Sequence, residues 1–498
     1  MAITILSSSY IGMNSYIVSV EADIFNGFPS FSIVGMGDTA ISESKERIRS
    51  SLKNIGVKFP SKRVIVNLSP ADIKKKGSHF DLSICVGILA NLDFISNLAL
   101  LENYLILGEL SLNGDVKSCK GIINAAILAK NNNLKGIIIP YENTKEALLI
   151  KGINIVPVKN LGDILKFLND GIQRTIESEN ILEIEPVNED IDFSDIKGQF
   201  LAKRAVEIAA AGGHNIFLIG DPGSGKSMLA KRMTTILPEM YEEEIIETTK
   251  IYSIAGMLSE EEPIITKRPF RAPHHTASIV SLVGGSVKPG EISLALHGIL
   301  FLDELGEYPT KLLEVLRQPL EDGKIIISRS DFVATYPVNM LLITATNPTP
   351  SGYFPDDMRC TDSLRDIKRY MKKFSGPLLD RMDIYVELKR LTNEEMMSKE
   401  RGESSAEIKC RVKNAREIQL KRYNKKFINK DMRKKDLEKY CKLDENMEEL
   451  MELAIEKFNL SARSYDKILK VARTIADLEG VEDININHLS EALNYRKR

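Results

Sequence analysis

A glycine-rich run of eight residues carries the clearest chemical signal in the chain. It fits the pattern G-x-x-x-x-G-K-[ST] and consists of Gly220, Asp221, Pro222, Gly223, Ser224, Gly225, Lys226 and Ser227. Glycines let backbone N–H groups converge on phosphate oxygens, and a helix that begins at the loop adds the positive end of its dipole. We expect the Lys226 ammonium to reach the β- and γ-phosphates and the Ser227 hydroxyl to bind Mg²⁺. The run therefore predicts a site for a nucleoside triphosphate and Mg²⁺.

Two adjacent acids, Asp303 and Glu304, end an apolar run of four residues, 299–302. An aspartate at a strand end can hold the hydration shell of Mg²⁺, and a neighbouring glutamate can polarise the water that attacks the γ-phosphate. Many strands end in acids, so the pair carries weight because a phosphate loop precedes it. Together the two motifs favour nucleotide hydrolysis over a simple nucleotide switch.

The elements that must position these motifs are also readable. An apolar strand is expected at 214–220 and a helix at 227–237, so the glycine-rich loop joins a strand to a helix. Further elements are a helix at 202–212 and strands at 297–304 and 338–347. Before them, β-like runs at 63–68, 104–110 and 136–140 alternate with helical stretches at 41–56 and 120–133. The fold class is therefore α/β.

Composition divides the chain into three units, which agrees with a length of 498 residues. Eight acidic residues and no Lys or Arg lie between Glu177 and Asp195, which is typical of a solvated linker. From Thr392 the chain becomes helical, rich in Lys and Glu and almost free of Gly and Pro. The expected boundaries are 1–168 for a first α/β domain, 169–195 for the acidic linker, 196–391 for the nucleotide domain and 392–498 for a helical domain.

Charge and cysteine usage limit the compartment and the partners. The formal net charge is −2, so no global basic excess points to nucleic acid. Five cysteines lie far apart without a C-x-x-C pair, which favours a reducing compartment over a disulfide framework. No secretory signal is apparent, and no stretch reaches the roughly 18 apolar residues of a membrane span. The sequence predicts a cytoplasmic, soluble protein.

The order of several motifs resembles that of AAA+ ATPases, and in particular the magnesium-chelatase-like ComM/YifB family. The motifs are GDPGSGKS (220–227), FRAPHHTAS (270–278), GEISLA (290–295), ILFLDE (299–304), ATNP (345–348) and SGPLLDRMD (375–383). Runs at 27–52, 62–72 and 460–480 fit the same family, so the resemblance covers essentially the whole chain. It implies an N-terminal Lon-protease-like α/β domain, a central AAA+ P-loop domain and a C-terminal helical lid.

The resemblance also assigns roles to three residues. Asn347 matches sensor 1, whose amide orients the attacking water, although an Asn-Pro turn would explain it as well. Arg381 matches the arginine finger that acts on the ATP of a neighbouring subunit, and such a finger contributes about 10³–10⁵ in rate. Arg463 matches sensor 2 on the lid. For both arginines the alternative is a solvated or salt-bridging side chain. A finger that acts across subunits implies a ring, and the family implies a homo-hexamer.

An insertion before Asp303 contains Lys267, Arg268, Arg271 and the pair His274 and His275. Neighbouring histidines point in different directions on most backbones and no Cys or carboxylate lies at ligand spacing, so a metal site is not expected. The turn at Gly284 and Gly285 with nearby Lys288 and an expected hairpin at 320–337, with Lys324 and Arg329, are candidate pore-facing segments. Solvated loop charges are the alternative.

One departure from the family concerns zinc. Many relatives carry a cysteine cluster after sensor 1, but here Thr349, Ser351 and Met358 replace three of its four thiols and only Cys360 remains. One thiolate cannot hold a structural Zn²⁺ ion, so ATP and Mg²⁺ are the expected cofactors and no zinc is predicted. In a smaller departure, Leu296 replaces a histidine that relatives usually carry.

The N-terminal domain resembles the end of a Lon-type peptidase domain over residues 108–143. That enzyme uses a Ser–Lys dyad, but Ile123 stands where the lysine is expected and the usual surroundings of the nucleophile are absent near Ser78 and Ser83. The fold can be shared without the chemistry. We expect no peptidase activity.

The resemblance implies a hexameric DNA helicase that promotes branch migration during recombination of incoming DNA in natural transformation. The alternative is a chelatase-like ATPase that remodels a protein partner. Eight Lys or Arg against one Asp at 420–435 favour single-stranded or branched DNA slightly, although a solvated basic helix or loop on the lid is the better explanation of these charges. A ring needs positive charge only at its pore, so the chain average of −2 does not exclude DNA.

Overall fold

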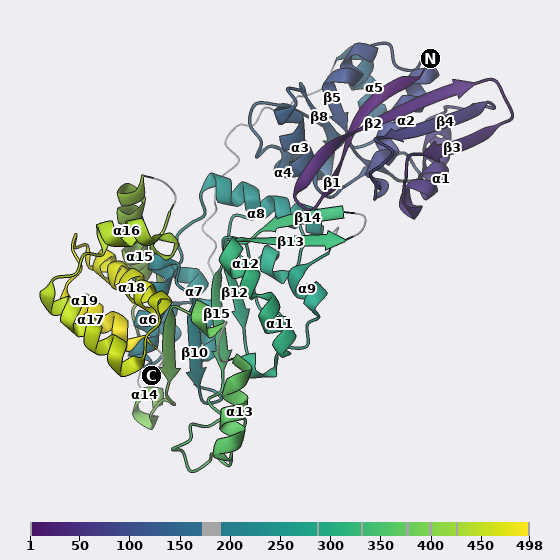
Figure 1. Cartoon of the computed structure of the whole chain (residues 1–498). Coiled ribbons are helices and arrows are strands. Elements are labelled where there is room, and N and C mark those ends of the chain that lie inside the picture. Colours follow the sequence, from purple (N-terminus) through teal and green to yellow (C-terminus); the bar gives the residue numbers. More distant parts are fainter. Residues whose placement is uncertain are drawn as a thin grey trace.

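The structure is a computed structural model that describes residues 2–171, 191–285, 288–329, 332–374, 378–397, 401–424 and 427–496. Three regions are visible in Figure 1: an N-terminal region (2–171) with its own sheet, a central region (191–397) with a second sheet, and a C-terminal helical region (401–496) beside that second sheet. Most of the acidic linker, residues 172–190, lies outside the described residues.

The N-terminal region is built on a seven-stranded mixed sheet with the order β3-β4-β2-β1-β5-β8-β9. Its strands are β1 (Ile3–Ile11), β2 (Asn14–Phe25), β3 (Ser30–Val34), β4 (Arg63–Ser69), β5 (Tyr104–Ile106), β8 (Gly136–Pro140) and β9 (Asn154–Val158). Its helices are α1 (Thr39–Asn54), α2 (Asp81–Asn91), α3 (Ile122–Asn131), α4 (Thr144–Ala147) and α5 (Leu161–Asp170). The antiparallel pair β1 and β2 was not expected from the sequence. The run 104–110 also does not form one strand, because Gly108 N donates to His79 O at 2.9 Å and separates β5 from the short hairpin of β6 (Glu109–Leu110) and β7 (Val116–Lys117).

The central region contains a five-stranded parallel sheet with the order β11-β12-β15-β10-β16. Its strands are β10 (Ile216–Gly220), β11 (Phe270–Arg271), β12 (Ile299–Leu302), β15 (Leu341–Thr346) and β16 (Ile384–Leu388). Its helices are α6 (Phe200–Gly212), α7 (Lys226–Ile236), α8 (Glu242–Ala255), α9 (Ile279–Val283), α10 (Glu291–Leu294), α11 (Thr310–Val315), α12 (Arg317–Asp322), α13 (Leu364–Phe374) and α14 (Asn393–Met397). The expected hairpin at 320–337 forms as β13 (Lys324–Arg329) and β14 (Phe332–Pro337), and its first residues belong to α12 instead.

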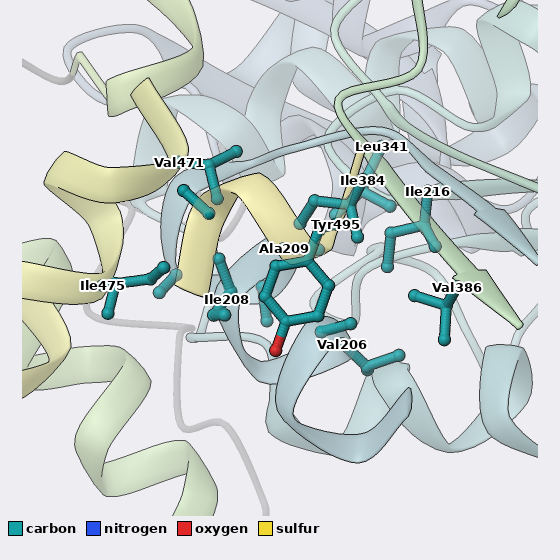
Figure 2. Packing of buried hydrophobic residues seen from close by; sticks show 14 of the residues in the cluster. Val206, Ile208, Ala209, Ile216, Leu341, Ile384, Val386, Val471, Ile475 and Tyr495 are labelled. Atoms are coloured by element: carbon teal, nitrogen blue, oxygen red, sulfur yellow. The ribbon is translucent and has the colours of Figure 1, made fainter. Parts of the chain in front are cut away.

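The C-terminal helices share one hydrophobic core with the central sheet. They are α15 (Ser405–Tyr423), α16 (Lys434–Tyr440), α17 (Glu445–Phe458), α18 (Ala462–Glu479) and α19 (Ile486–Asn494). Figure 2 shows Ile475 of α18 on the side of Ile208 of α6, and Val206 of α6 on the side of Val386 of β16, and all four belong to the same buried cluster. Because α6 also packs on the sheet, the helical region is anchored to the strands that carry the phosphate loop.

The N-terminal region docks on the central region through α3 and α8. Buried apolar side chains of both helices form one cluster, which includes Ile123 and Ile251. At its edge Ser253 Oγ of α8 accepts a hydrogen bond from Gly121 N at 2.9 Å and donates one to Glu146 Oε2 at 2.6 Å. The two regions therefore share a core, and Figure 1 shows them in contact at α8 and β14. Among the described helices none is long and apolar enough to cross a membrane.

Candidate nucleotide site

The glycine-rich loop lies where a phosphate loop must lie, between β10 and α7. Gly223 and Gly225 adopt positive φ angles of 76° and 94°, a conformation that side chains with a Cβ rarely adopt. No described heavy atom lies within 4 Å of the position that a Cβ would take at either glycine. The loop is thus a concave backbone surface at the amino end of α7, which suits an anion.

Lys226 connects the loop to the end of the neighbouring strand β15. Its Nζ donates to Gly220 O at 2.5 Å, to Asp221 O at 3.0 Å and to Asn347 Oδ1 at 3.1 Å. Burial lowers the pKa of the ammonium, while Asp303, Asp221 and Glu304 act in the opposite direction. The structure thus brings the expected phosphate-binding lysine and the expected sensor asparagine into direct contact.

Ser227 and Asp303, the two residues expected to bind Mg²⁺, contact each other. Ser227 Oγ donates to Asp303 Oδ2 at 2.6 Å, across the carboxyl ends of β10 and β12. A hydroxyl and a carboxylate oxygen are the hard ligands that Mg²⁺ prefers. Asp221 Oδ1 and Ser224 Oγ, beside them in the loop, are buried and have no hydrogen-bond partner among the described residues. This donor set fits a nucleotide phosphate with Mg²⁺.

Glu304 stands in the left-handed region with φ 50° and is exposed. Its Oε2 lies 3.2 Å from His275 Nδ1, so the second histidine of the expected insertion contacts the expected water-polarising carboxylate. The loop that carries His275 is held by Tyr308, whose hydroxyl donates to Pro273 O at 2.6 Å. His274 instead contacts Thr276 Oγ1 through its Nδ1, at 2.8 Å. The histidine pair therefore borders the nucleotide site, a relation that the sequence analysis missed.

Arg381 and Arg463 lie together at a different place, on Glu321 of α12. Each guanidinium contacts Glu321 Oε1, Arg463 at 3.3 Å and Arg381 more closely. Arg381 precedes β16, and its carbonyl accepts a hydrogen bond from Asn215 Nδ2, just before β10. Both residues are therefore at the amino ends of the parallel strands. Lys226, Asp303 and Asn347 follow the carboxyl ends, roughly 17 Å away for strands of five residues.

The cations expected to face a polymer divide between internal partners and the surface, and within 420–435 the side chains of Lys421, Arg433, Lys434 and Lys435 are exposed. Arg268 donates to the carbonyls of Pro238 and His297, and Arg271 pairs with Glu291. In the basic stretch 420–435, Arg422 pairs with the buried Asp477 and Lys430 donates to Asn339 Oδ1 at 3.1 Å. Lys324 is exposed on the hairpin, and the side chain of Arg329 lies outside the described residues.

An exposed basic surface lies on α13, which the sequence analysis did not single out. One face of this helix carries Arg365, Lys368, Arg369 and Lys372, all exposed, while Tyr370 and Phe374 on its other face are buried. Arg365 and Lys368 make no ion pair with any described residue, and Arg369 has only Asp366 at 3.7 Å. The helical spacing of cations in LRDIKRYMKKF was the signal available in the sequence.

The N-terminal region has a cavity of about 560 Å³ close to the residues compared with a peptidase site. Ser78 lines this cavity, and its hydroxyl donates to the Glu109 carboxylate rather than to a lysine. Ser83 donates to Phe80 O at 2.9 Å within its own helix. Ile123 is fully buried in the cluster shared with α8. The position that a peptidase would need for lysine thus serves the contact between the two regions.

Known families match nearly the whole chain. Residues 192–396 match the family "Magnesium chelatase, subunit ChlI", residues 20–143 match "Subunit ChlI of Mg-chelatase", and residues 402–496 match the C-terminal family of the same subunit. The chain is 42% identical to the competence protein ComM of Haemophilus influenzae over 99% of this chain and 97% of that protein. It is 38% identical to YifB of Escherichia coli, over 98% and 95%. A Lon protease of Buchnera aphidicola is 26% identical over 30% of the chain and 20% of that protease.

The fold, the phosphate loop and these matches define an AAA+ protein of the magnesium-chelatase type, with a Lon-like N-terminal region and a C-terminal helical region. The expected α/β fold class is thereby confirmed. Within this class the chain belongs to the ComM/YifB family.

Proposed function

We propose that this protein is an ATP-hydrolysing ring motor, a homo-hexamer, that moves DNA. The observation that supports a ring is the distance, along the central sheet, between the phosphate-binding residues and Arg381. The phosphate loop, Asp303 and Asn347 lie at the carboxyl ends of the strands, and Arg381 lies at the amino ends. This separation supports the proposal that Arg381 acts on the nucleotide of a neighbouring subunit rather than on that of its own chain.

In this proposal the residues of the nucleotide site divide the work. Lys226 and the loop N–H groups bind the β- and γ-phosphates, and Ser227 and Asp303 hold Mg²⁺, which neutralises phosphate charge when bound. Glu304 accepts a proton from the attacking water, and the Asn347 amide orients that water against the γ-phosphate. Arg381 of the neighbouring subunit stabilises the charge that develops in the transition state.

Two observations support DNA as the polymer. The relative with 42% identity is named a competence protein, and uptake of DNA is the context in which branch migration would be required. The exposed cations of α13 offer a surface for phosphates, whereas Arg271 and Arg422 are paired with carboxylates inside the protein. We infer that α13 contacts the phosphate backbone of single-stranded or branched DNA.

A branch-migration assay on a three-stranded DNA substrate, with and without ATP, tests this function. The wild-type protein should displace the strand only with ATP, and its affinity for forked DNA should fall steeply with salt because phosphate contacts release counterions. Replacing Arg365, Lys368, Arg369 and Lys372 by Ala should weaken binding and reduce the salt slope by up to about 3. The matched control replaces Lys434, Lys435, Lys439 and Lys442 by Ala and should leave binding near wild type. ATP turnover that ignores DNA, without strand displacement, would favour remodelling of a protein partner instead.

A further inference from the structure

The segment around Arg381 is held by the C-terminal helical region as well as by its own sheet. Lys467 of α18 donates to Asp380 O at 2.6 Å and to Met382 O at 2.9 Å, on either side of Arg381. The same ammonium lies 3.1 Å from Asp383 Oδ1. Three contacts from one side chain therefore fix residues 380–383 against α18.

Lys467 and Asp383 are both largely buried, so their charges depend on each other. The Lys467 side chain is only 17% exposed and that of Asp383 only 14%, so their charges have lost most of their water. The other carboxylate oxygen of Asp383 accepts from Asn215 N at 2.9 Å, at the start of β10. Burial lowers the pKa of Lys467, and Asp383 acts against this shift. Buried charges persist when they are paired in this way.

A second connection runs through Glu321. Its Oε1 contacts Arg381, whose side chain is 9% exposed, and also Arg463, which is 66% exposed. Arg463 and Lys467 are four residues apart in α18, so they lie on the same face of that helix. One face of α18 thus holds the Arg381 segment through Lys467 and presents Arg463 beside Arg381 through Glu321.

We propose that Lys467 and Glu321 are positioning residues that join Arg381 and Arg463 into one unit, which acts on the nucleotide of a neighbouring subunit. The inference rests on the proposed ATP-hydrolysing ring. It goes beyond that function by assigning positioning roles to Lys467 and Glu321. Movement of α18 then moves the arginine finger directly.

A double-mutant cycle on ATP turnover tests the proposal. Lys467→Met should lower kcat about tenfold with KM within about twofold of wild type, because it acts through a residue needed in the transition state. In an Arg381→Ala background the same substitution should cost less than about twofold in single-turnover rate. An equal loss in both backgrounds, or no loss in either, would overturn the proposal. Lys467→Arg, which keeps the charge, should recover part of the loss.

Controls separate this role from a general loss of structure. Lys470→Met removes another ammonium from α18, one that donates to Lys430 O and not to the Arg381 segment, and should leave kcat near wild type. Glu321→Gln alters an exposed side chain and should lower kcat severalfold, whereas Glu314→Gln on α11 should not. A Glu321→Gln variant with wild-type kcat would remove Glu321 from the unit.

Two further measurements keep the inference distinct from the proposed function. Hydrogen exchange at residues 378–383 should become faster in Lys467→Met, whether or not the protein hydrolyses ATP. Unchanged exchange there would show that Lys467 does not hold this segment.

A mixing experiment tests whether Arg463 acts on the nucleotide of a neighbouring subunit. Inactive Arg463→Ala protein mixed with inactive Lys226→Ala protein should regain turnover, because each supplies what the other lacks at a shared interface. Mixtures that never exceed the two separate rates would contradict action on a neighbour's nucleotide. A wild-type protein without ATP turnover would refute the proposed function. The hydrogen exchange at residues 378–383 would still show whether Lys467 holds the Arg381 segment.

Discussion

The candidate nucleotide site and the cavity of the N-terminal region both lie in α/β folds related to enzymes, but only the first brings together the side chains that the related chemistry uses. In the central region Lys226 contacts Asn347 and Ser227 contacts Asp303, at the carboxyl ends of β10, β15 and β12. In the N-terminal region the Ser78 hydroxyl faces Glu109, and Ile123 is buried against α8. A shared fold therefore predicts the scaffold, and only the contacts between particular side chains predict the chemistry.

The largest expected effect is in the nucleotide site. Lys226→Ala removes the ammonium that binds the β- and γ-phosphates, so ATP turnover should fall at least about 100-fold and ATP binding should weaken. Equilibrium binding of a fluorescent ATP analogue and phosphate release measure the two effects. Lys231→Ala, an exposed lysine on the same helix, is the matched control and should keep both near wild type. Normal turnover by Lys226→Ala would contradict the proposal that this loop binds the phosphates of ATP.

The next prediction concerns the contact between Glu146 of the N-terminal region and α8, and its effect on the free energy of unfolding. Burial raises the pKa of Glu146 from 4.5 to about 7, against hydrogen bonds from Ser253, Asn143 and Ile123 N. The folded protein thus binds a proton between pH 4.5 and 7 that the unfolded chain has lost. The free energy of unfolding should therefore fall by roughly 3 kcal/mol as pH rises through this window.

Thermal unfolding of wild type and Glu146→Gln from pH 4.5 to 8 measures this contribution. The difference in stability between the two proteins should change in favour of the variant as pH rises, since the carboxamide does not ionise. Glu142→Gln, at an exposed neighbouring position, should follow the wild-type pH dependence. Parallel curves for wild type and Glu146→Gln would show that the Glu146 carboxyl titrates normally at the contact with α8.

The smallest expected effect concerns the cavity. Ser78→Ala should leave ATP turnover unchanged, because the Ser78 hydroxyl is bonded to Glu109 and not to a nucleophile-activating lysine. Wild-type protein and the variant should both leave an unfolded test protein uncleaved in the presence of ATP, as gel analysis would show. Cleavage by the wild type that is lost in Ser78→Ala would make the two regions alike in chemistry and would contradict the comparison.

The candidate nucleotide site could be located from the sequence because its parts are local. The phosphate loop is contiguous, and Asp303 and Asn347 follow apolar strands whose carboxyl ends meet at one edge of a parallel sheet. The unit of Glu321, Arg381 and Lys467 could not be predicted in this way, because its members come from separate elements and meet only through packing. The contact of His275 with Glu304 was missed for the same reason.

Charge was the least predictable property, since a sequence shows cations without their partners. Arg422 counted toward a basic surface, but Asp477, 55 residues away, pairs with it. The strand β1 was missed because its serines, Ser7, Ser8 and Ser9, hide the apolar pattern, although all three are buried. An ion pair between α15 and α18 decided the first outcome, and strand pairing in the mixed sheet decided the second.

The most direct test of nucleotide hydrolysis at Asp303 and Glu304 is the steady-state rate of the Glu304→Gln variant, measured together with its affinity for ATP. The account predicts that turnover is lost while ATP binding stays close to wild type, because the carboxamide cannot accept the proton of the attacking water whereas Lys226, Ser227 and Asp303 remain in place. A Glu304→Gln variant that hydrolyses ATP at the wild-type rate would contradict the assignment of the site.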